Sequence, residues 1–386
     1  MNYISFKIRQ ERMQRNWSQE GLCTGICSVS YLSKIEQGKA DPSPEIVRLL
    51  MERLGIEWHD EQDSCSGQLI EQAQELLLSD ETDSFFLLLE TPEWKRCKNS
   101  RWELDWLLLE HFSVPPEQPL DPSLEICMDQ KQLALQRHLQ GRWEEALRLW
   151  PCGWMYLGAG ESYYCQGDTA RAVEFLQIAN DLAAQEGRPR IMLRARGFMG
   201  NCYCNIHDFD SMERHYRAAR RLAIALDEPD FLRNIEYNIA TARLEEGECD
   251  AFLSYFEKLD QPTGIDLHKL ALCYEKLGRR DDALAALDLA DIMGSSLLGN
   301  ALPQMCNLVR LRLNDPNYLD SESYGEALLS CFALCKEHLP MGFCLFHLPW
   351  MLEWYEHHRQ YKQAYSLLMD FPDYHKNSSF NADSMS

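Results

Sequence analysis

The apolar side chains near the start of the chain recur at the spacing of short helices that each bury one face. Ile4 and Ile8 mark such a face in a first helix, and Leu32 and Ile35 mark one in a third. A fourth helix is predicted from the apolar positions Ile46, Leu49, Leu50 and Leu54. The pattern predicts a small helical domain over residues 1–60.

Polar residues and glycines mark where these helices begin and end. Ser18, Ser28 and Ser43 precede the second, third and fourth helices, where a hydroxyl can accept a hydrogen bond from a free backbone N–H. Gly25 separates the second helix from the third, and Gly38 follows the third. Two short helices joined by a tight turn form a helix-turn-helix unit.

The rest of the chain shows helical periodicity without the alternation of a β-strand. One order of small and large residues recurs at a spacing of about forty residues. Its clearest copies are Tyr156, Ala159, Gly160, Tyr163, Gly167, Ala172, Leu176 and Ala179, then Arg196, Met199, Gly200, Tyr203, His207, Met212, Tyr216 and Ala219. Further copies include Ile239, Leu270 and Met351. The body is therefore predicted to be an array of antiparallel helix pairs.

The composition predicts a large hydrophobic core, and the charge is unevenly distributed along the chain. The chain has 386 residues, 45% of them hydrophobic, and a formal net charge of −22. Residues 1–60 carry equal numbers of acidic and basic side chains, so the remainder holds the whole negative charge. A duplex would be repelled by such a body, and a nucleic-acid contact is expected at the N-terminal end alone.

Several classes of protein are disfavoured by what the sequence contains. Apolar runs are far shorter than a membrane span, and the N-terminus does not read as a secretory signal, so we expect a cytoplasmic protein without a membrane partner. The 15 cysteines are an odd number scattered through helical segments, which favours reduced core thiols. No motif for catalysis, metal or cofactor binding was found, and neither an enzyme nor a cofactor is expected.

The segment from Ser18 to Lys39 resembles the Cro/lambda-repressor-like (XRE) helix-turn-helix family. The residues that carry the resemblance are Arg12, Gln19, Leu22, Ser33, Ile35, Glu36, Gly38 and Pro42. The resemblance implies that the third helix enters the major groove. It assigns base reading to Val29, Ser30, Tyr31 and Lys34, and phosphate contacts to Gln19, Ser28 and Lys39. Arg12 and Glu36 are expected to form a buried structural ion pair.

The recurring order in the body resembles the tetratricopeptide repeat. Together with the head, it makes the chain similar to the Rgg/PlcR-type peptide-responsive regulators. The implied fold is all-α, an N-terminal helix-turn-helix DNA-binding domain followed by a tetratricopeptide-like right-handed α-superhelix. The predicted domains are the head at 1–60, a helical connector at 61–122, a repeat sensor domain at 123–375 and a flexible tail at 376–386.

The same resemblance implies a homodimer on a two-fold operator of double-stranded DNA, controlled by a short signalling peptide. Amide side chains can clamp a peptide backbone because they both donate and accept hydrogen bonds. The predicted peptide-binding residues are Asn201, Asn205, Asn234, Asn238, His268, Asn307 and Arg310. Arg196 and Arg243, with His268, are candidates for meeting a peptide carboxylate. A second hypothesis remains open, a protein-interaction scaffold whose head is vestigial or only dimerises.

Overall fold

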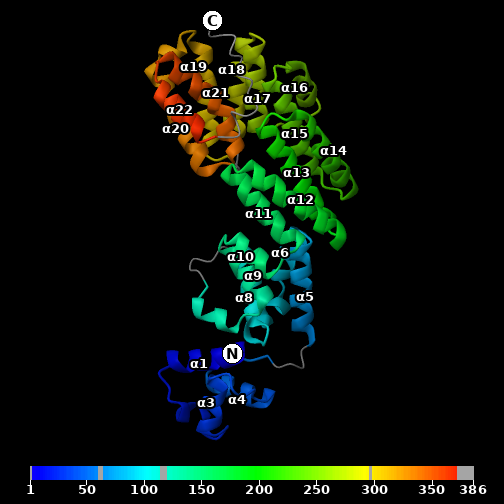
Figure 1. Ribbon diagram of the computed structural model, residues 1–386, viewed down its shortest axis with the longest axis vertical. Coiled ribbons are helices and arrows are strands. Elements are labelled where there is room, and N and C mark those ends of the chain that lie inside the picture. The colour runs from blue at the N-terminus through cyan, green and yellow to red at the C-terminus, as the bar shows by residue number, and fades with distance from the viewer. Residues whose placement is uncertain (1, 60–63, 114–119, 295–297, 372–386) are drawn as a thin grey trace. The chain divides into compact units, whose positions relative to one another are not determined.

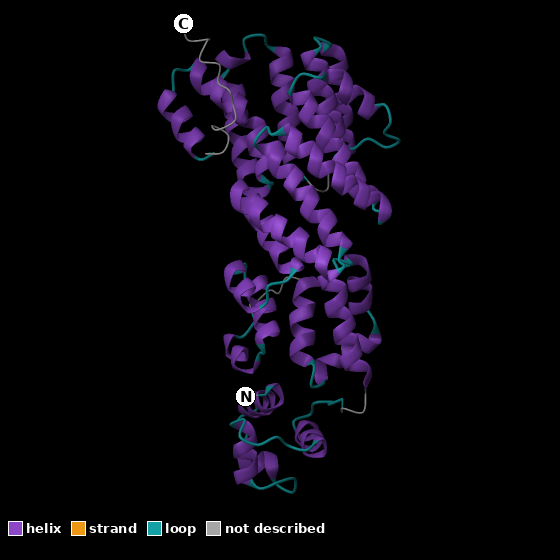
Figure 2. Cartoon of the chain, turned by 45° about the vertical axis from the view of Figure 1, so that its right-hand side comes forward, coloured by secondary structure: helices purple, strands orange, loops and turns teal. Residues whose placement is uncertain are grey.

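The computed structural model describes residues 2–59, 64–113, 120–294 and 298–371 (Figures 1 and 2). The structure is 78% helical, and the described residues include no strand, which confirms the predicted all-α class. None of the described helices is long and apolar enough to cross a membrane. The predicted tail at 376–386 lies outside the described residues.

The chain divides into two compact units. Unit 1 comprises residues 1–158 and 182–191, and unit 2 comprises residues 159–181 and 192–386. The helical repeats predicted from residue 123 onward are therefore shared between the two units.

The head of unit 1 consists of four helices that begin where the serines predict. They are α1 (Tyr3–Gln14), α2 (Gln19–Cys23), α3 (Val29–Glu36) and α4 (Pro44–Arg53). The hydroxyl of Ser18 accepts from the Gly21 N–H at 3.0 Å, and that of Ser28 accepts from the Tyr31 N–H at 3.2 Å. The head encloses a core of Ile8, Leu22, Cys23, Leu32, Ile35, Val47, Leu50, Met51 and Leu54. This apolar set holds α3 by one face and leaves the other accessible.

Further helices of unit 1 follow the head. They are α5 (Ser64–Leu78), α6 (Thr82–Leu89), α7 (Pro92–Arg96), η1 (Cys97–Asn99), α8 (Glu103–Ser113), η2 (Pro122–Cys127), α9 (Gln130–Leu139) and α10 (Trp143–Leu149). Of these, α5 to α8 enclose the buried Trp94. The buried Lys7 of α1 donates to Glu103 of α8. This ion pair joins the head to the helices that follow it.

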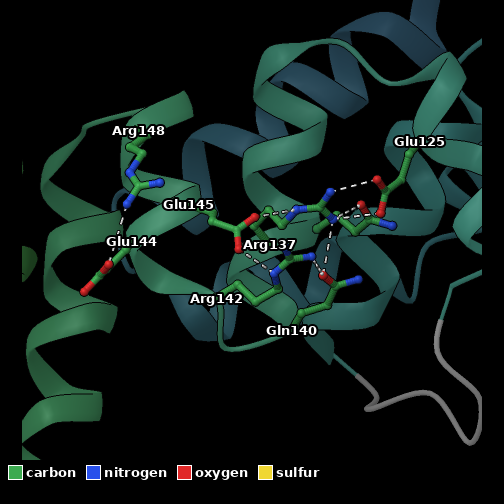
Figure 3. A network of polar contacts seen from close by, with 8 residues as sticks. Glu125, Arg137, Gln140, Arg142, Glu144, Glu145 and Arg148 are labelled. Atoms are coloured by element: carbon green, nitrogen blue, oxygen red, sulfur yellow. Dashed lines mark hydrogen bonds and ion pairs between the residues drawn. The ribbon is translucent and has the colours of Figure 1, made fainter.

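A charged network fixes η2 against α9 and α10 (Figure 3). Arg137 donates to both carboxylate oxygens of Glu125, at 2.8 and 2.7 Å. Its Nε lies 3.4 Å from Glu145, which also accepts from Arg142 at 2.8 Å. Because Arg137 is itself buried, these carboxylates compensate a charge that would otherwise be costly to bury.

Most of the array of helix pairs belongs to unit 2. Its helices are α11 (Gly153–Gln166), α12 (Thr169–Glu186), α13 (Pro189–Asn205), α14 (Phe209–Ala225), α15 (Pro229–Glu245), α16 (Cys249–Phe256), α17 (Gly264–Lys276), α18 (Arg280–Met293), α19 (Ala301–Asn314), η3 (Tyr318–Asp320), α20 (Glu322–His338), α21 (Met341–His357) and α22 (Tyr361–Met369). The ends of α11, α12 and α13 at residues 153–158, 182–186 and 189–191 belong to unit 1. The recurring small residues allow paired helices to approach closely. A Cβ atom at Gly160 would lie 2.7 Å from Leu176, and one at Gly200 would lie 2.4 Å from Tyr216.

Candidate functional site

The exposed side of α3 carries the residues predicted to read bases. Val29 is 43% exposed, and Ser30 and Lys34 are also exposed. Tyr31 is half-buried, and its hydroxyl donates to the backbone oxygen of Asp41 at 3.3 Å. The first turn of α3 therefore presents a methyl-bearing side chain, a hydroxyl and, one turn later, an ammonium. These are the groups that can contact a thymine methyl and the hydrogen-bonding edges of bases.

The three residues predicted to hold phosphate have different surroundings. Lys39 is exposed, just after α3. Ser28 caps α3, and its hydroxyl lies 3.1 Å from that of Ser30. Gln19 is engaged within the head, because its amide nitrogen donates to Glu36 at 2.8 Å.

Arg12 and Glu36 lie together between α1 and α3. Arg12 donates from Nε at 2.6 Å and from Nη2 at 2.9 Å to the two carboxylate oxygens of Glu36. It also donates to the backbone oxygen of Trp17 at 2.6 Å. Hydrogen bonding to Glu36 raises the pKa of Arg12. With Gln19 bound to the same carboxylate, one buried acidic group connects the first three helices of the head.

Unit 2 contains two cavities that share the lining residues His207, Thr241, Glu245, Lys269, Leu345 and Phe346. Their volumes are about 510 Å³ and about 210 Å³. Helices α13, α15 and α17 line one side, and the N-terminal half of α21 lines the other. We call the two cavities together the inner cavity.

Amide and hydroxyl groups gather at the smaller part of the inner cavity. Asn201, Asn205 and Asn238 line it, and Tyr164 and Tyr216 lie beside them. The Asn201 side-chain oxygen accepts from the Tyr216 hydroxyl at 2.5 Å and from the Asn238 amide at 3.0 Å. Three of the predicted peptide-binding residues are thus brought together from two neighbouring helices.

The other predicted peptide-binding residues are not among those that line the inner cavity. Asn234 and Asn307 are exposed, and Arg310 binds Asp288 at 3.0 Å and Asp291 at 2.6 Å. His268 is fully buried, and desolvation holds its pKa well below the usual value.

The arginines considered for a peptide carboxylate also have partners within the protein. Arg196 donates to Asn180 at 2.9 Å, and Arg243 donates to Glu213 at 3.0 Å.

Apart from His207, the larger part of the inner cavity is lined by residues that the sequence pattern did not single out. Apolar side chains of α21, including Phe346 and Trp350, face charged residues of α17 and α19. Arg312 donates to Glu275 at 2.9 Å and lies 4.5 Å over the Trp350 ring. Lys269, only 4% exposed, lies 3.1 Å over the ring of Phe346. Burial lowers the pKa of Lys269 to about 8, against the opposing effect of Glu245.

A known sequence family matches the head. Residues 8–60 match the family described as Helix-turn-helix. The head is a helix-turn-helix unit. Over 51 residues the chain is 47% identical to the Transcriptional activator NprA of Geobacillus stearothermophilus. That alignment spans only 13% of either chain.

The chain is similar in fold to a solved structure. A Rap protein complexed with Competence and Sporulation Factor matches with a TM-score of 0.50 and 13% identity, over 82% of this chain and 98% of that chain. ComR from S. thermophilus, solved with DNA and its signalling peptide ComS, gives a TM-score of 0.35 and 15% identity. That match spans 62% of this chain and 99% of that chain.

Proposed function

We propose that the protein is a sequence-specific DNA-binding transcriptional regulator whose unit 2 binds a short signalling peptide that controls it. The observation that carries the proposal is a helix-turn-helix head with the exposed Val29, Ser30 and Lys34 on one side of α3. The 47% identity of a 51-residue segment to a transcriptional activator supports the regulatory role.

On DNA, α3 enters the major groove with its first turn against the base edges. Val29 contacts a thymine methyl, and Lys34 donates to guanine O6 or N7. Lys39 and the capped N-terminus of α3 at Ser28 contact phosphates and set the position of the head. Two heads of a homodimer on a two-fold operator supply the specificity that one short recognition helix lacks.

In unit 2, an extended peptide occupies the inner cavity. Asn201, Asn205 and Asn238 bind its backbone, because each amide can accept from a peptide N–H and donate to a peptide carbonyl. For Asn201 and Asn238 this requires exchanging the bond that they make with each other. The fold similarity to the Rap protein, solved with its bound factor, supports ligand binding by such an array.

The DNA-binding part is tested by selecting duplexes from a random pool with the full-length protein and measuring their affinity by fluorescence anisotropy. Lys34→Ala should weaken binding to the selected duplex by about 1–3 kcal/mol and relax the preference at one base position. Lys39→Ala should weaken binding to all duplexes by a similar factor. It should also reduce the slope of log affinity against log salt concentration by about one.

Lys258→Ala is the matched control, since it removes an exposed lysine that follows α16 in unit 2. It should leave DNA affinity unchanged. If the wild-type protein selects no duplex, or if Lys34→Ala binds as tightly as wild type, the regulator proposal is wrong. Capture of a protein segment by a chain that selects no duplex would favour the scaffold hypothesis.

A further inference from the structure

Lys269 is an unusual residue to find in the wall of a cavity. It belongs to α17, whose consecutive residues Asp266 to Cys273 are all buried. Helices α15, α16, α18 and α19 pack around α17, and α21 adds Phe346 over the ammonium. The Lys269 side chain lines both parts of the inner cavity. Its charge is therefore placed inside the array and faces the space that a ligand would occupy.

The ammonium of Lys269 is incompletely compensated by the protein. Its Nζ lies over the π face of Phe346, and among the described residues no oxygen accepts a hydrogen bond from it. Glu245 attracts it electrostatically but does not lie at ion-pair distance. A cation over an aromatic ring retains hydrogen-bond donors that need acceptors, and burying such a charge is costly unless these are supplied.

The other cations near the inner cavity differ from Lys269. Arg312 has a carboxylate partner in Glu275, although its Nη1 is buried without a hydrogen-bond acceptor. Lys276 lies at the exposed end of α17, where water can solvate it. Among these three lining cations, Lys269 is the one that is buried and has no carboxylate partner among the described residues.

We propose that Lys269 is the anchor for a carboxylate of the bound peptide, and that an apolar side chain next to this carboxylate packs against Phe346 and Trp350. The inference rests on the proposed function and specifies its ligand. The carboxylate is either the C-terminal group of the peptide or an Asp or Glu side chain. Asn201, Asn205 and Asn238, which line the smaller part of the cavity together with Lys269, then bind the backbone of the same peptide.

The chemistry favours a carboxylate over a neutral group. A hydrogen bond between an ammonium and a carboxylate is about twice as strong as one between neutral groups. The carboxylate enters beside apolar walls formed by Leu244, Leu272 and Pro349, where water screens the pair poorly. The net charge of −22 would repel an anionic peptide elsewhere on the surface, so binding of a carboxylate depends on this local cation.

The test uses full-length protein and mixed-sequence synthetic heptapeptides in three pools. The first pool has free C-terminal acids, the second has C-terminal amides, and the third has amides and lacks Asp and Glu. Bound peptides are separated by size exclusion and identified by mass spectrometry. If the C-terminal group is the ligand, the acid pool should be retained and the amide pools lost. If a side-chain carboxylate is the ligand, the peptides retained from the second pool should carry Asp or Glu at one common position.

For a retained peptide, Lys269→Met should weaken binding at least about tenfold, and Lys269→Arg should restore part of the affinity. Lys258→Met removes an exposed lysine and should bind as wild type does. The thermal midpoint of each variant shows whether it is folded, and the pool selectivity of the wild-type protein tests the inference even if Lys269→Met does not fold.

The two possible failures are distinguishable. Equal retention of all three pools by the wild-type protein would overturn the assignment to Lys269 and leave peptide binding intact. Retention of no peptide from any pool would overturn peptide binding, and the Lys269 anchor with it. A retained acid peptide that binds a folded Lys269→Met variant as tightly as wild type would also contradict the assignment.

Discussion

His138 is a half-buried ionisable side chain packed among rings that do not titrate. Its imidazole stacks on Trp154 at 4.2 Å, meets Trp143 edge-on at 4.5 Å and lies 5.6 Å from Phe112. A Cβ at the neighbouring Gly158 would lie 2.6 Å from it, so no water can intervene there. Desolvation lowers the pKa of His138 from 6.5 to about 3. The side chain is consequently neutral in the folded protein over the ordinary pH range.

This shift predicts a loss of stability in mild acid. Below the unfolded pKa of 6.5, the unfolded chain gains a proton at His138 that the folded chain does not bind until about pH 3. The contribution of neutral His138 to the free energy of unfolding is fully present above pH 6.5 and falls by at most about 1.4 kcal/mol per pH unit below it. Urea unfolding of wild type and of His138→Leu at several pH values from 7.5 to 4.5 measures it.

The quantity compared is the slope of the free energy of unfolding against pH, because the substitution also changes packing and so shifts the free energy at every pH. As the pH falls below 6.5, wild type should lose stability faster than His138→Leu. Above pH 6.5, the two curves of unfolding free energy against pH should be parallel. Parallel curves across the whole range would show that the imidazole is protonated equally in both states.

Among the elements, the head depends on one carboxylate that receives hydrogen bonds from two other helices. Glu36 of α3 accepts from Arg12 of α1 and from Gln19 of α2, and its side chain is only 4% exposed. The rest of the head core is small, so this polar connection is a considerable part of what fixes the position of α3.

Arg12→Ala should therefore destabilise the head by about 3–5 kcal/mol, because it leaves the Glu36 carboxylate buried without its cation. Hydrogen exchange monitored on peptides covering α1 to α3 measures this loss, and peptides from unit 2 are the internal reference. The double variant Arg12→Met/Glu36→Met removes both charges and should cost less than Arg12→Ala. A head that exchanges as slowly in Arg12→Ala as in wild type would show that the pair is not structural.

Local chemistry accounts for what the sequence predicts well. A serine hydroxyl can cap only the helix that follows it, so Ser18 and Ser28 mark helix starts without knowledge of the fold. The spacing of apolar residues identifies the buried side of α3, and with it the exposed side. Small residues such as Gly160 and Gly200 mark close helix pairs.

What the sequence does not reveal is which helices meet across the array. Lys269 would be placed on a solvated side by an amphipathic pattern, but α17 is enclosed by several helices and by the distant α21. Tyr164 follows Tyr163 directly, yet Tyr164 lines the inner cavity and Tyr163 packs in the array. Asn201 and Asn234 are the same residue type on similar helices, and only tertiary contacts distinguish them.

At the scale of the whole molecule, the proposed control of DNA binding by a peptide requires the two units to be energetically coupled. The inner cavity belongs to unit 2 and the head to unit 1. A peptide that binds unit 2 equally well in every conformation of unit 1 would change nothing at the head. Binding alone is therefore weaker evidence for control than an effect of the peptide on the head.

The last prediction separates binding from control. A retained peptide at about one hundred times its Kd should stabilise unit 2 by about 2.7 kcal/mol, seen as slower hydrogen exchange around α13, α15 and α17. If it also controls the head, it should change exchange in α1 to α4 and shift operator affinity by about 5–150-fold. The operator duplex must then change peptide affinity by the same factor. Protection confined to unit 2, with operator affinity unchanged, would leave a peptide-binding protein whose DNA binding the peptide does not control.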